Sequence, residues 1–182
     1  MRLTRREALA AAGAVVASPA VPALGAAATP SLDGAAKLSG RRFGSAVAWT
    51  PPGTDAGSFT NPLYAAILER ECSLLVPENQ LKWQWVRRSP GTFDFRAFDA
   101  IAGYAVAHGF KLRGHTLFWT PTKWYPKWLA EMKFASPAQA EKLLTDHVRT
   151  VCSRYGTRIY SYDVVNEAVQ PETGAIRDTN VT

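Results

Sequence analysis

Apolar residues along this chain fall into two alternating patterns, short continuous runs and longer stretches with helical spacing. The short runs predict strands that are buried on both faces, at residues 42–48, 72–76, 111–117 and 159–165. The longer stretches predict helices at residues 62–71, 95–108 and 137–155. Pro62 and Pro137 suit a first helical turn, Ser136 suits an N-cap, and Gly109 and Gly156 follow helix ends. Strands and helices therefore alternate from residue 42 onward.

This alternation predicts an α/β fold in which helical crossovers join the strands of a parallel sheet. No Gly-x-Gly-x-x-Gly follows the first strand and no phosphate-binding loop occurs, so a doubly wound nucleotide-binding fold is the weaker alternative. A (β/α)8 barrel, or TIM barrel, takes about 250 residues, so four strands make about half of one. The sequence stops at Thr182, soon after the fourth strand. We therefore expect residues 29–182 to be the N-terminal portion of a truncated (β/α)8 barrel domain.

Residues 1–28 have the pattern of an export signal. Basic residues come first, an Ala- and Val-rich apolar run follows, and small residues end the segment. The run is short and is interrupted by Gly13, Pro19 and Pro22, so it does not suit a membrane-spanning helix. The stretch Thr-Arg-Arg-Glu-Ala-Leu at residues 4–9 resembles a twin-arginine signal. We expect cleavage near residues 26–28 and a secreted or periplasmic protein; an N-terminus that stays attached is the alternative.

Composition and charge narrow the possible partners. The 182 residues are 47% hydrophobic and 20% charged, as in an ordinary globular protein, and the net charge is +6. Removing the three Arg and one Glu of residues 1–28 leaves a charge near +4, with scattered basic residues. A nucleic-acid-binding surface would show a basic stripe, so we expect no nucleic-acid partner. We also expect no membrane partner and a monomer. Cys72 and Cys152 match no metal spacing; we expect buried thiols, with one disulfide as the alternative in an exported protein.

Polar residues follow three of the predicted strands, at the ends where the working residues of barrels lie. They come in three groups: Glu78, Asn79 and Lys82 after the second strand, His115 and Trp119 with the third, and Asn166 and Glu167 at the end of the fourth. Taken singly, such a carboxylate would more often cap a helix or face solvent, and His115 would be structural. Their order and spacing favour one binding site on a single rim.

Three of these segments, in this order, carry a family resemblance. Residues 77–83 (Pro-Glu-Asn-Gln-Leu-Lys-Trp), 113–119 (Arg-Gly-His-Thr-Leu-Phe-Trp) and 162–168 (Tyr-Asp-Val-Val-Asn-Glu-Ala) resemble signature segments of the glycoside hydrolase family 10 endo-β-1,4-xylanases. Residues 89–95 also resemble the turn before the second helix of that family. The resemblance covers roughly residues 43–169. It implies a (β/α)8 barrel that hydrolyses xylan with retention of anomeric configuration and without a cofactor.

The resemblance also implies a role for each matching residue. Glu167 would be the general acid/base, and Asn166 would hydrogen-bond the 2-hydroxyl of the sugar at the cleavage point. His115 and Trp119 would border that subsite, and Glu78, Asn79 and Lys82 would bind the next sugar toward the non-reducing end. Trp83 is expected to pack in the core rather than to contact sugar. Retaining enzymes pair such an acid with a second carboxylate about 5–5.5 Å away.

The chain departs from the family pattern at three points. The family's nucleophile is a glutamate in a Thr-Glu-x-Asp-like setting on a later strand, and no such segment occurs here. We therefore expect the 182-residue chain to be inactive alone. Thr120 stands where the family usually has His, and Tyr162 stands where it usually has Trp. Two alternatives remain open: another retaining β-glycanase of similar barrel fold, or a secreted carbohydrate-binding protein that has lost catalysis.

Overall fold

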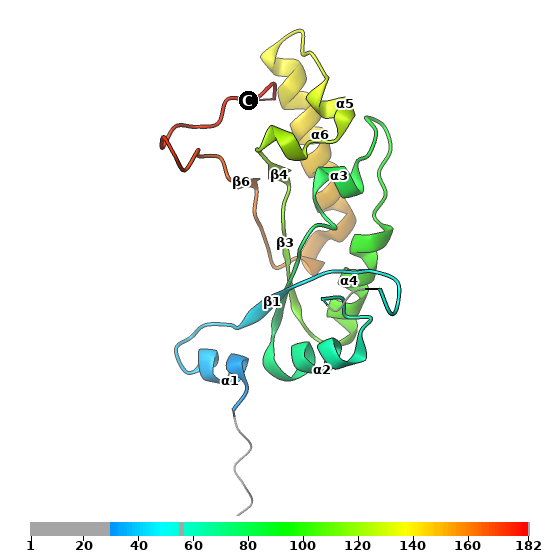
Figure 1. Ribbon diagram of the computed structural model, residues 1–182, viewed down its shortest axis with the longest axis vertical. Helices are drawn as coiled ribbons and strands as arrows, with labels where there is room; N and C mark the ends of the chain where they lie inside the picture. Colours follow the sequence, from blue (N-terminus) through cyan, green and yellow to red (C-terminus); the bar gives the residue numbers. More distant parts are fainter. Residues whose placement is uncertain (1–29, 55–56, 182) are drawn as a thin grey trace, which may run out of the picture.

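The computed structural model describes residues 30–54 and 57–181, so the proposed signal at residues 1–28 lies outside it. Four strands form one sheet: β1 (Gly44–Val47), β2 (Leu74–Pro77), β3 (Lys111–Gly114) and β5 (Ser161–Tyr162). Their order is β1-β2-β3-β5 and every neighbouring pair is parallel. The predicted parallel α/β fold is therefore confirmed for the described residues, with each strand lying beside the next one along the chain (Figure 1).

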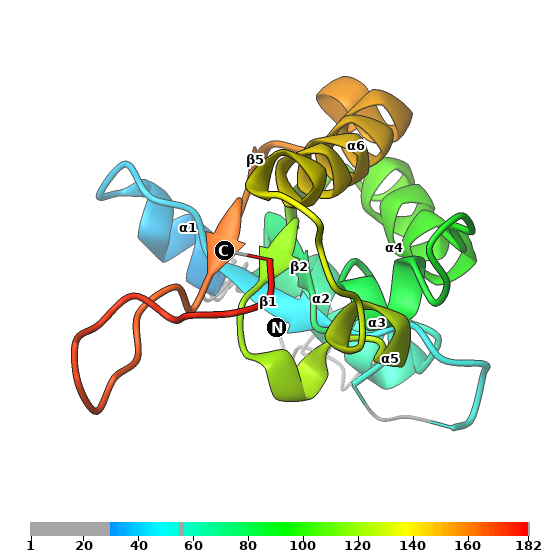
Figure 2. The ribbon, with the colours of Figure 1, turned by 90° about the horizontal axis from the view of Figure 1, so that it is seen from above.

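Three long helices connect the strands and lie on the same side of the sheet. They are α2 (Pro62–Glu71), α4 (Arg96–Ala107) and α6 (Pro137–Tyr155). Figure 2 shows α4 and α6 side by side on the outside of the strands. Asn61 caps α2 by accepting hydrogen bonds from the amides of Leu63 and Tyr64, and Pro62 opens it. Ser136 occupies the N-cap position of α6 as predicted, but its side chain makes no capping hydrogen bond.

Two predicted strands are each divided in two. The third strand breaks after Gly114 and resumes as β4 (Phe118–Trp119), and the fourth resumes as β6 (Val165–Asn166). β4 and β6 pair in parallel as a second, two-stranded sheet. Between the halves, the Thr116 hydroxyl donates to the Asp163 carbonyl at 2.8 Å, and the His115–Thr116 peptide is cis. The expectation of two continuous strands was wrong because residues 115–117 lie opposite only residues 163 and 164, so the pairing register changes there.

Several short elements were not predicted. They are α1 (Leu32–Lys37), α3 (Trp83–Val86), α5 (Lys127–Ala130) and the 3₁₀ turns η1 (Thr122–Trp124) and η2 (Gly156–Arg158). Three of them, α3, η1 and α5, lie in the loops that follow strand ends, as Figure 1 shows. These loops carry the polar groups of the candidate site.

The main hydrophobic core fills the space between the sheet and the long helices. Its fully buried members include Leu75 and Leu112 from the strands, and Phe98, Ile101 and Val151 from the helices. Gly114 allows β3 and β5 to approach, because a Cβ there would collide with the Tyr162 ring. A second cluster under the strand ends contains Trp83, Phe118, Leu129 and Val181.

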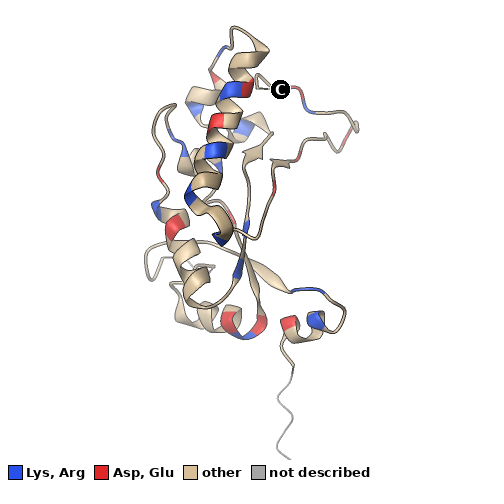
Figure 3. Cartoon of the chain, turned by 180° about the vertical axis from the view of Figure 1, so that it is seen from behind, with Lys and Arg blue, Asp and Glu red and all other residues tan. Residues whose placement is uncertain are grey.

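The described surface carries both charge signs. Figure 3 shows basic and acidic residues interspersed along α6, where Lys142 and Asp146 form an ion pair at 2.7 Å. Cys72 and Cys152 are free thiols and are half-buried rather than fully buried as expected. No described helix has the length and apolar character needed to cross a membrane.

Candidate active site

The predicted site residues all lie at the carboxyl ends of parallel strands. Glu78 directly follows β2, His115 directly follows β3, and Trp119 ends β4. Asn166 ends β6 and Glu167 comes next. Because carboxyl ends of parallel strands meet at one rim of the sheet, these side chains share one edge of the molecule.

Lys82 contacts two of the other predicted residues. Its side chain is 8% exposed, and its Nζ donates to Asn79 Oδ1 at 3.0 Å. The same Nζ lies 4.2 Å from the centroid of the Trp119 ring, a cation–π distance. Burial lowers the pKa of Lys82, whereas the nearby carboxylates of Glu167 and Glu78 act in the opposite direction. Lys82 therefore lies within electrostatic reach of the proposed acid/base.

Trp119 forms the aromatic part of this site. Its ring stacks on Trp124, with the ring centroids 5.5 Å apart and an angle of 9° between the ring planes. Trp124 itself is 47% exposed. Trp83 has the packing role expected of it: it is 4% exposed, donates its Nε1–H to the Leu117 carbonyl at 2.6 Å, and stacks on His147. The neighbouring tryptophans thus divide between the rim and the core.

His115 is held by a carboxylate that sequence reasoning left without a role. Its Nδ1 lies 2.9 Å from Asp163 Oδ2, and a carboxylate only accepts, so Nδ1 carries the proton. Asp163 also forms a two-point ion pair with Arg113, in which Nε lies 3.1 Å from Oδ2. The hydrogen bond from Arg113 and, to a smaller extent, that from His115 lower the pKa of Asp163. The charged Asp163 therefore orients the imidazole and leaves its Nε2 available to a ligand.

Glu167 has an uncommon backbone conformation. Its φ is 55°, the left-handed region that few residues other than Gly adopt. Two side chains hold its carbonyl oxygen: Thr120 Oγ1 at 2.5 Å and Arg177 Nε at 2.9 Å. Thr120 is 2% exposed and also lies 3.1 Å from the Asn166 carbonyl. The residue that departs from the family pattern thus supports the backbone of the proposed acid/base.

The structure joins some predicted site residues and leaves others apart. Asn79, Lys82 and Trp119 are in direct contact, and Glu78 and Glu167 act on Lys82 through space. His115 contacts Asp163 rather than any of these. Within the described part of the chain, the side chains of Asn166 and Glu167 form no hydrogen bond or ion pair with another predicted site residue. The Glu167 side chain is exposed at the rim.

These groups suit neutral polar ligands better than metals. Within residues 30–54 and 57–181, no cluster of three or more His, Cys, Asp or Glu side chains could hold a metal ion. An ammonium, an amide, an imidazole and an indole face one rim beside two carboxylates. Such a mixture can hydrogen-bond sugar hydroxyls, stack on a sugar ring and exchange a proton. Parallel strands with helical crossovers and polar groups at their carboxyl ends are the arrangement of part of a (β/α) barrel.

The match to known proteins specifies the family. The glycosyl hydrolase family 10 model matches residues 31–182, and the chain belongs to this family. The similar solved structures are xylanases of this family, whose fold is the (β/α)8 barrel, and the described residues form a partial barrel with parallel strands. The predicted fold class and family resemblance are therefore confirmed.

Several curated relatives share this part of the sequence. Endo-1,4-beta-xylanase B of Paenibacillus barcinonensis is 41% identical over 106 residues, covering 56% of this chain and 31% of the relative. Endo-1,4-beta-xylanase 3 of Hypocrea jecorina is 31% identical over 153 residues, covering 84% of this chain and 41% of the relative. The chain thus spans 31% to 41% of the length of these two relatives.

Solved structures agree with the sequence relatives. Xylanase XynB from Paenibacillus barcinonensis, complexed with a conduramine derivative, superposes with a TM-score of 0.68 at 30% identity. That match covers 85% of this chain and 44% of the solved chain. Xylanase 10B from Thermotoga petrophila, in complex with xylobiose, gives a TM-score of 0.70 at 25% identity, covering 84% and 44% of the two chains.

Proposed function

We propose that the complete protein is an endo-acting, retaining β-1,4-xylanase in which Glu167 is the general acid/base. The observation that supports this most directly is Glu167 at a strand end, close enough for its carboxylate to act on the pKa of Lys82 at the same rim. Family membership and the xylanase names of the relatives point to the same reaction.

Hydrolysis would take two steps. Glu167 donates a proton to the glycosidic oxygen while a second carboxylate attacks the anomeric carbon, so the C–O bond breaks and a glycosyl ester forms. Glu167 then removes a proton from water, which displaces the carboxylate and restores the starting configuration. The 182 residues hold no Thr-Glu-x-Asp-like segment. We propose that the nucleophile lies outside them.

The remaining rim residues would hold the sugar chain. Asn166 would hydrogen-bond the 2-hydroxyl at the cleavage point, with His115 and Trp119 beside that sugar. Glu78, Asn79 and Lys82 would bind the next sugar toward the non-reducing end. The Lys82–Asn79 hydrogen bond and the position of Lys82 over Trp119 support a shared role, because they hold these side chains in one arrangement before a ligand arrives.

Residues 1–28 would serve as a twin-arginine-type export signal, leaving a barrel domain that begins at residue 29. A polymer such as xylan cannot enter a cell intact, so export would bring the enzyme to its substrate. The basic start, short apolar run and small residues of the segment support this proposal. Replacing Arg5 and Arg6 together by Lys should leave the protein inside the cell, and export at the normal level would rule out the twin-arginine assignment.

The reaction is tested on the complete protein with three polymers. Xylan should be hydrolysed in preference to cellulose and mixed-linkage β-glucan, and a preference for either glucan would indicate another β-glycanase. Glu167→Gln should lower turnover of xylan by roughly 100- to 10,000-fold, the usual contribution of a general acid. Glu141→Gln, an exposed carboxylate on α6, is the matched control and should behave as wild type. Binding to xylan without hydrolysis by the unaltered protein would indicate a carbohydrate-binding function instead.

A further inference from the structure

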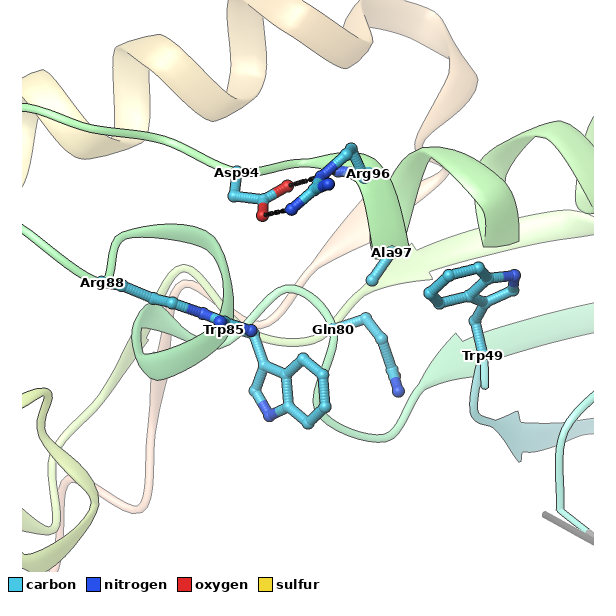
Figure 4. Close-up of a pocket in the computed structure, with 7 residues that line it drawn as sticks. All are labelled: Trp49, Gln80, Trp85, Arg88, Asp94, Arg96 and Ala97. Atoms are coloured by element: carbon cyan, nitrogen blue, oxygen red, sulfur yellow. Dashed lines mark hydrogen bonds and ion pairs between the residues drawn. The ribbon is translucent and has the colours of Figure 1, made fainter. Parts of the chain in front are cut away.

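A pocket is lined in part by the loop that follows β2. It lies between Trp49, two residues after β1, the short helix α3 and the first turn of α4, and it has a volume of about 230 Å³. Figure 4 shows its lining, which includes Trp49, Gln80, Trp85 and Arg88. None of the residues assigned above to the candidate active site lines it.

Two indole rings give this pocket its shape. In Figure 4 the rings of Trp49 and Trp85 lie on either side of the Gln80 side chain. Both tryptophans are partly exposed, whereas Trp83, the tryptophan of the same loop that serves the core, is only 4% exposed. Indole faces left in contact with solvent suit a flat ligand with an apolar face and polar edges, such as a sugar ring.

Gln80 supplies a fixed polar group between the two rings. It is 3% exposed, and its Oε1 accepts from the Asn79 amide at 3.1 Å, which sets the orientation of the side-chain amide. Among residues 30–54 and 57–181, no acceptor is found for its NH₂ group, so that group is available to a ligand hydroxyl. Asn79 turns its own side chain to Lys82, so consecutive residues serve the candidate active site and this pocket.

The charges around the pocket favour oxygen-bearing ligands. The Asp94 carboxylate forms a two-point ion pair with Arg96, whose Nε lies 2.9 Å from Oδ1 and whose Nη2 lies 2.6 Å from Oδ2. This pairing lowers the pKa of Asp94, so the carboxylate stays charged and paired with Arg96. The Arg88 guanidinium lies 5.9 Å from the Trp85 ring centroid and forms no ion pair with a described carboxylate. Arg88 therefore adds hydrogen-bond donors at the mouth of an aromatic pocket.

We propose that this pocket binds one pyranose ring of a polysaccharide, as a carbohydrate site separate from the candidate active site. Its volume of about 230 Å³ suits a single ring and not an oligosaccharide. The choice of a xylan-type ligand rests on the proposed function. The ring would lie over Gln80, against the exposed parts of Trp49 and Trp85, and would receive hydrogen bonds from Gln80 and Arg88. Either a sugar of the main chain or a side-chain uronic acid has this chemistry.

The experiment measures binding on the complete protein carrying Glu167→Gln, which prevents cleavage of the ligand. The two probes are linear xylohexaose and a glucuronic-acid-substituted xylo-oligosaccharide. Calorimetry measures the affinity for each probe, and NMR records the indole N–H resonances of Trp49 and Trp85. Both resonances should shift on titration. Trp85→Ala and Arg88→Ala should each weaken binding about five- to tenfold, the effect of removing one well-placed contact. Tyr160→Ala, an exposed aromatic before β5, is the control.

Each outcome separates this proposal from the proposed function. Weakened binding of both probes supports a main-chain sugar, and weakened binding of the substituted probe alone supports a uronic acid. Unshifted indole resonances, or affinities of both variants within about twofold of the parent, overturn the pocket assignment even if the wild-type enzyme hydrolyses xylan. Trp85-dependent binding by a wild-type protein that hydrolyses nothing supports the pocket and overturns the proposed reaction. Arg88→Ala keeps the test valid if Trp85→Ala fails to fold.

Discussion

Thr120→Val should disturb the proposed acid/base without touching its carboxylate. The Thr120 hydroxyl lies 2.5 Å from the Glu167 carbonyl and 3.1 Å from the Asn166 carbonyl. A hydroxyl has one proton, so the two carbonyls share one donor. Valine has nearly the same shape, so the substitution removes this donor without leaving a cavity. The affected residue, Glu167, is held at a φ of 55°, a conformation that persists only where surrounding contacts enforce it.

The magnitude follows from burial. Thr120 is 2% exposed, so water cannot replace the lost donor, and the free energy of unfolding should fall by about 1–3 kcal/mol. Arg177 still holds the Glu167 carbonyl at 2.9 Å, which limits the displacement of the backbone. A shift of a few tenths of an ångström in a proton donor should lower kcat on xylan by roughly tenfold, given that 1 Å costs roughly 100-fold.

The assay combines urea unfolding with steady-state hydrolysis of xylan by the complete protein. Thr150→Val is the matched control, because Thr150 also donates its hydroxyl to a backbone carbonyl, that of Asp146 at 2.7 Å, but within α6. The control should lose some stability and keep wild-type kcat. The reasoning fails if Thr120→Val retains wild-type kcat, or if both variants lose kcat in proportion to their stability.

Three further outcomes are expected. Arg113 and His115 lower the pKa of Asp163, so this carboxylate stabilises the fold above about pH 4. That stability is lost as pH falls through the folded-state pKa. Stability measured by urea unfolding should therefore depend less on acid pH in Asp163→Asn than in wild type. His147 is fully buried with neither ring nitrogen paired among the described residues, and burial lowers its pKa from 6.5 to about 3. Stability should therefore fall as pH drops from 6.5 toward 3, and His147→Phe should reduce that loss in thermal unfolding between pH 7 and 4. Lys82→Met should raise KM for xylo-oligosaccharides about tenfold with unchanged thermal stability, because the cost of burying an ammonium offsets what its contacts contribute.

A specific result would contradict each of these three predictions. Equal acid sensitivity of wild type and Asp163→Asn would mean that the carboxylate is not paired in solution. Greater loss of stability in acid for His147→Phe would mean that the imidazole has a partner. A wild-type KM for Lys82→Met would remove this residue from the sugar-binding site.

Local signals in the sequence predicted the elements whose ends depend on nearby residues. The helix at residues 62–71 was predicted with the bounds that α2 has, because Pro62 suits a first helical turn; the Asn61 cap was not predicted. The strands predicted at 111–117 and 159–165 are divided because residues 115–117 lie opposite only residues 163 and 164, which changes the pairing register. No local pattern contains a mismatch between segments so far apart in the sequence.

The candidate site shows the same division. Lys82 and Asn79 lie three residues apart, so their hydrogen bond agrees with the motif that singled them out. Asp163 was part of a quoted motif, but its role depends on Arg113 and His115, from another strand. Thr120 stood out only as a departure from the family pattern, and its hydroxyl proved to support Glu167 from 47 residues away.

The most direct test of the account is whether Glu167 acts as a proton donor. Glu167→Gln in the complete protein is assayed on xylan, whose leaving group requires a proton, and on an aryl xylobioside with an acidic phenol, which leaves without one. The account predicts a loss of roughly 100- to 10,000-fold on xylan and a much smaller loss in the formation of the glycosyl ester from the aryl substrate. Equal losses on both substrates, or wild-type turnover of xylan, would contradict it.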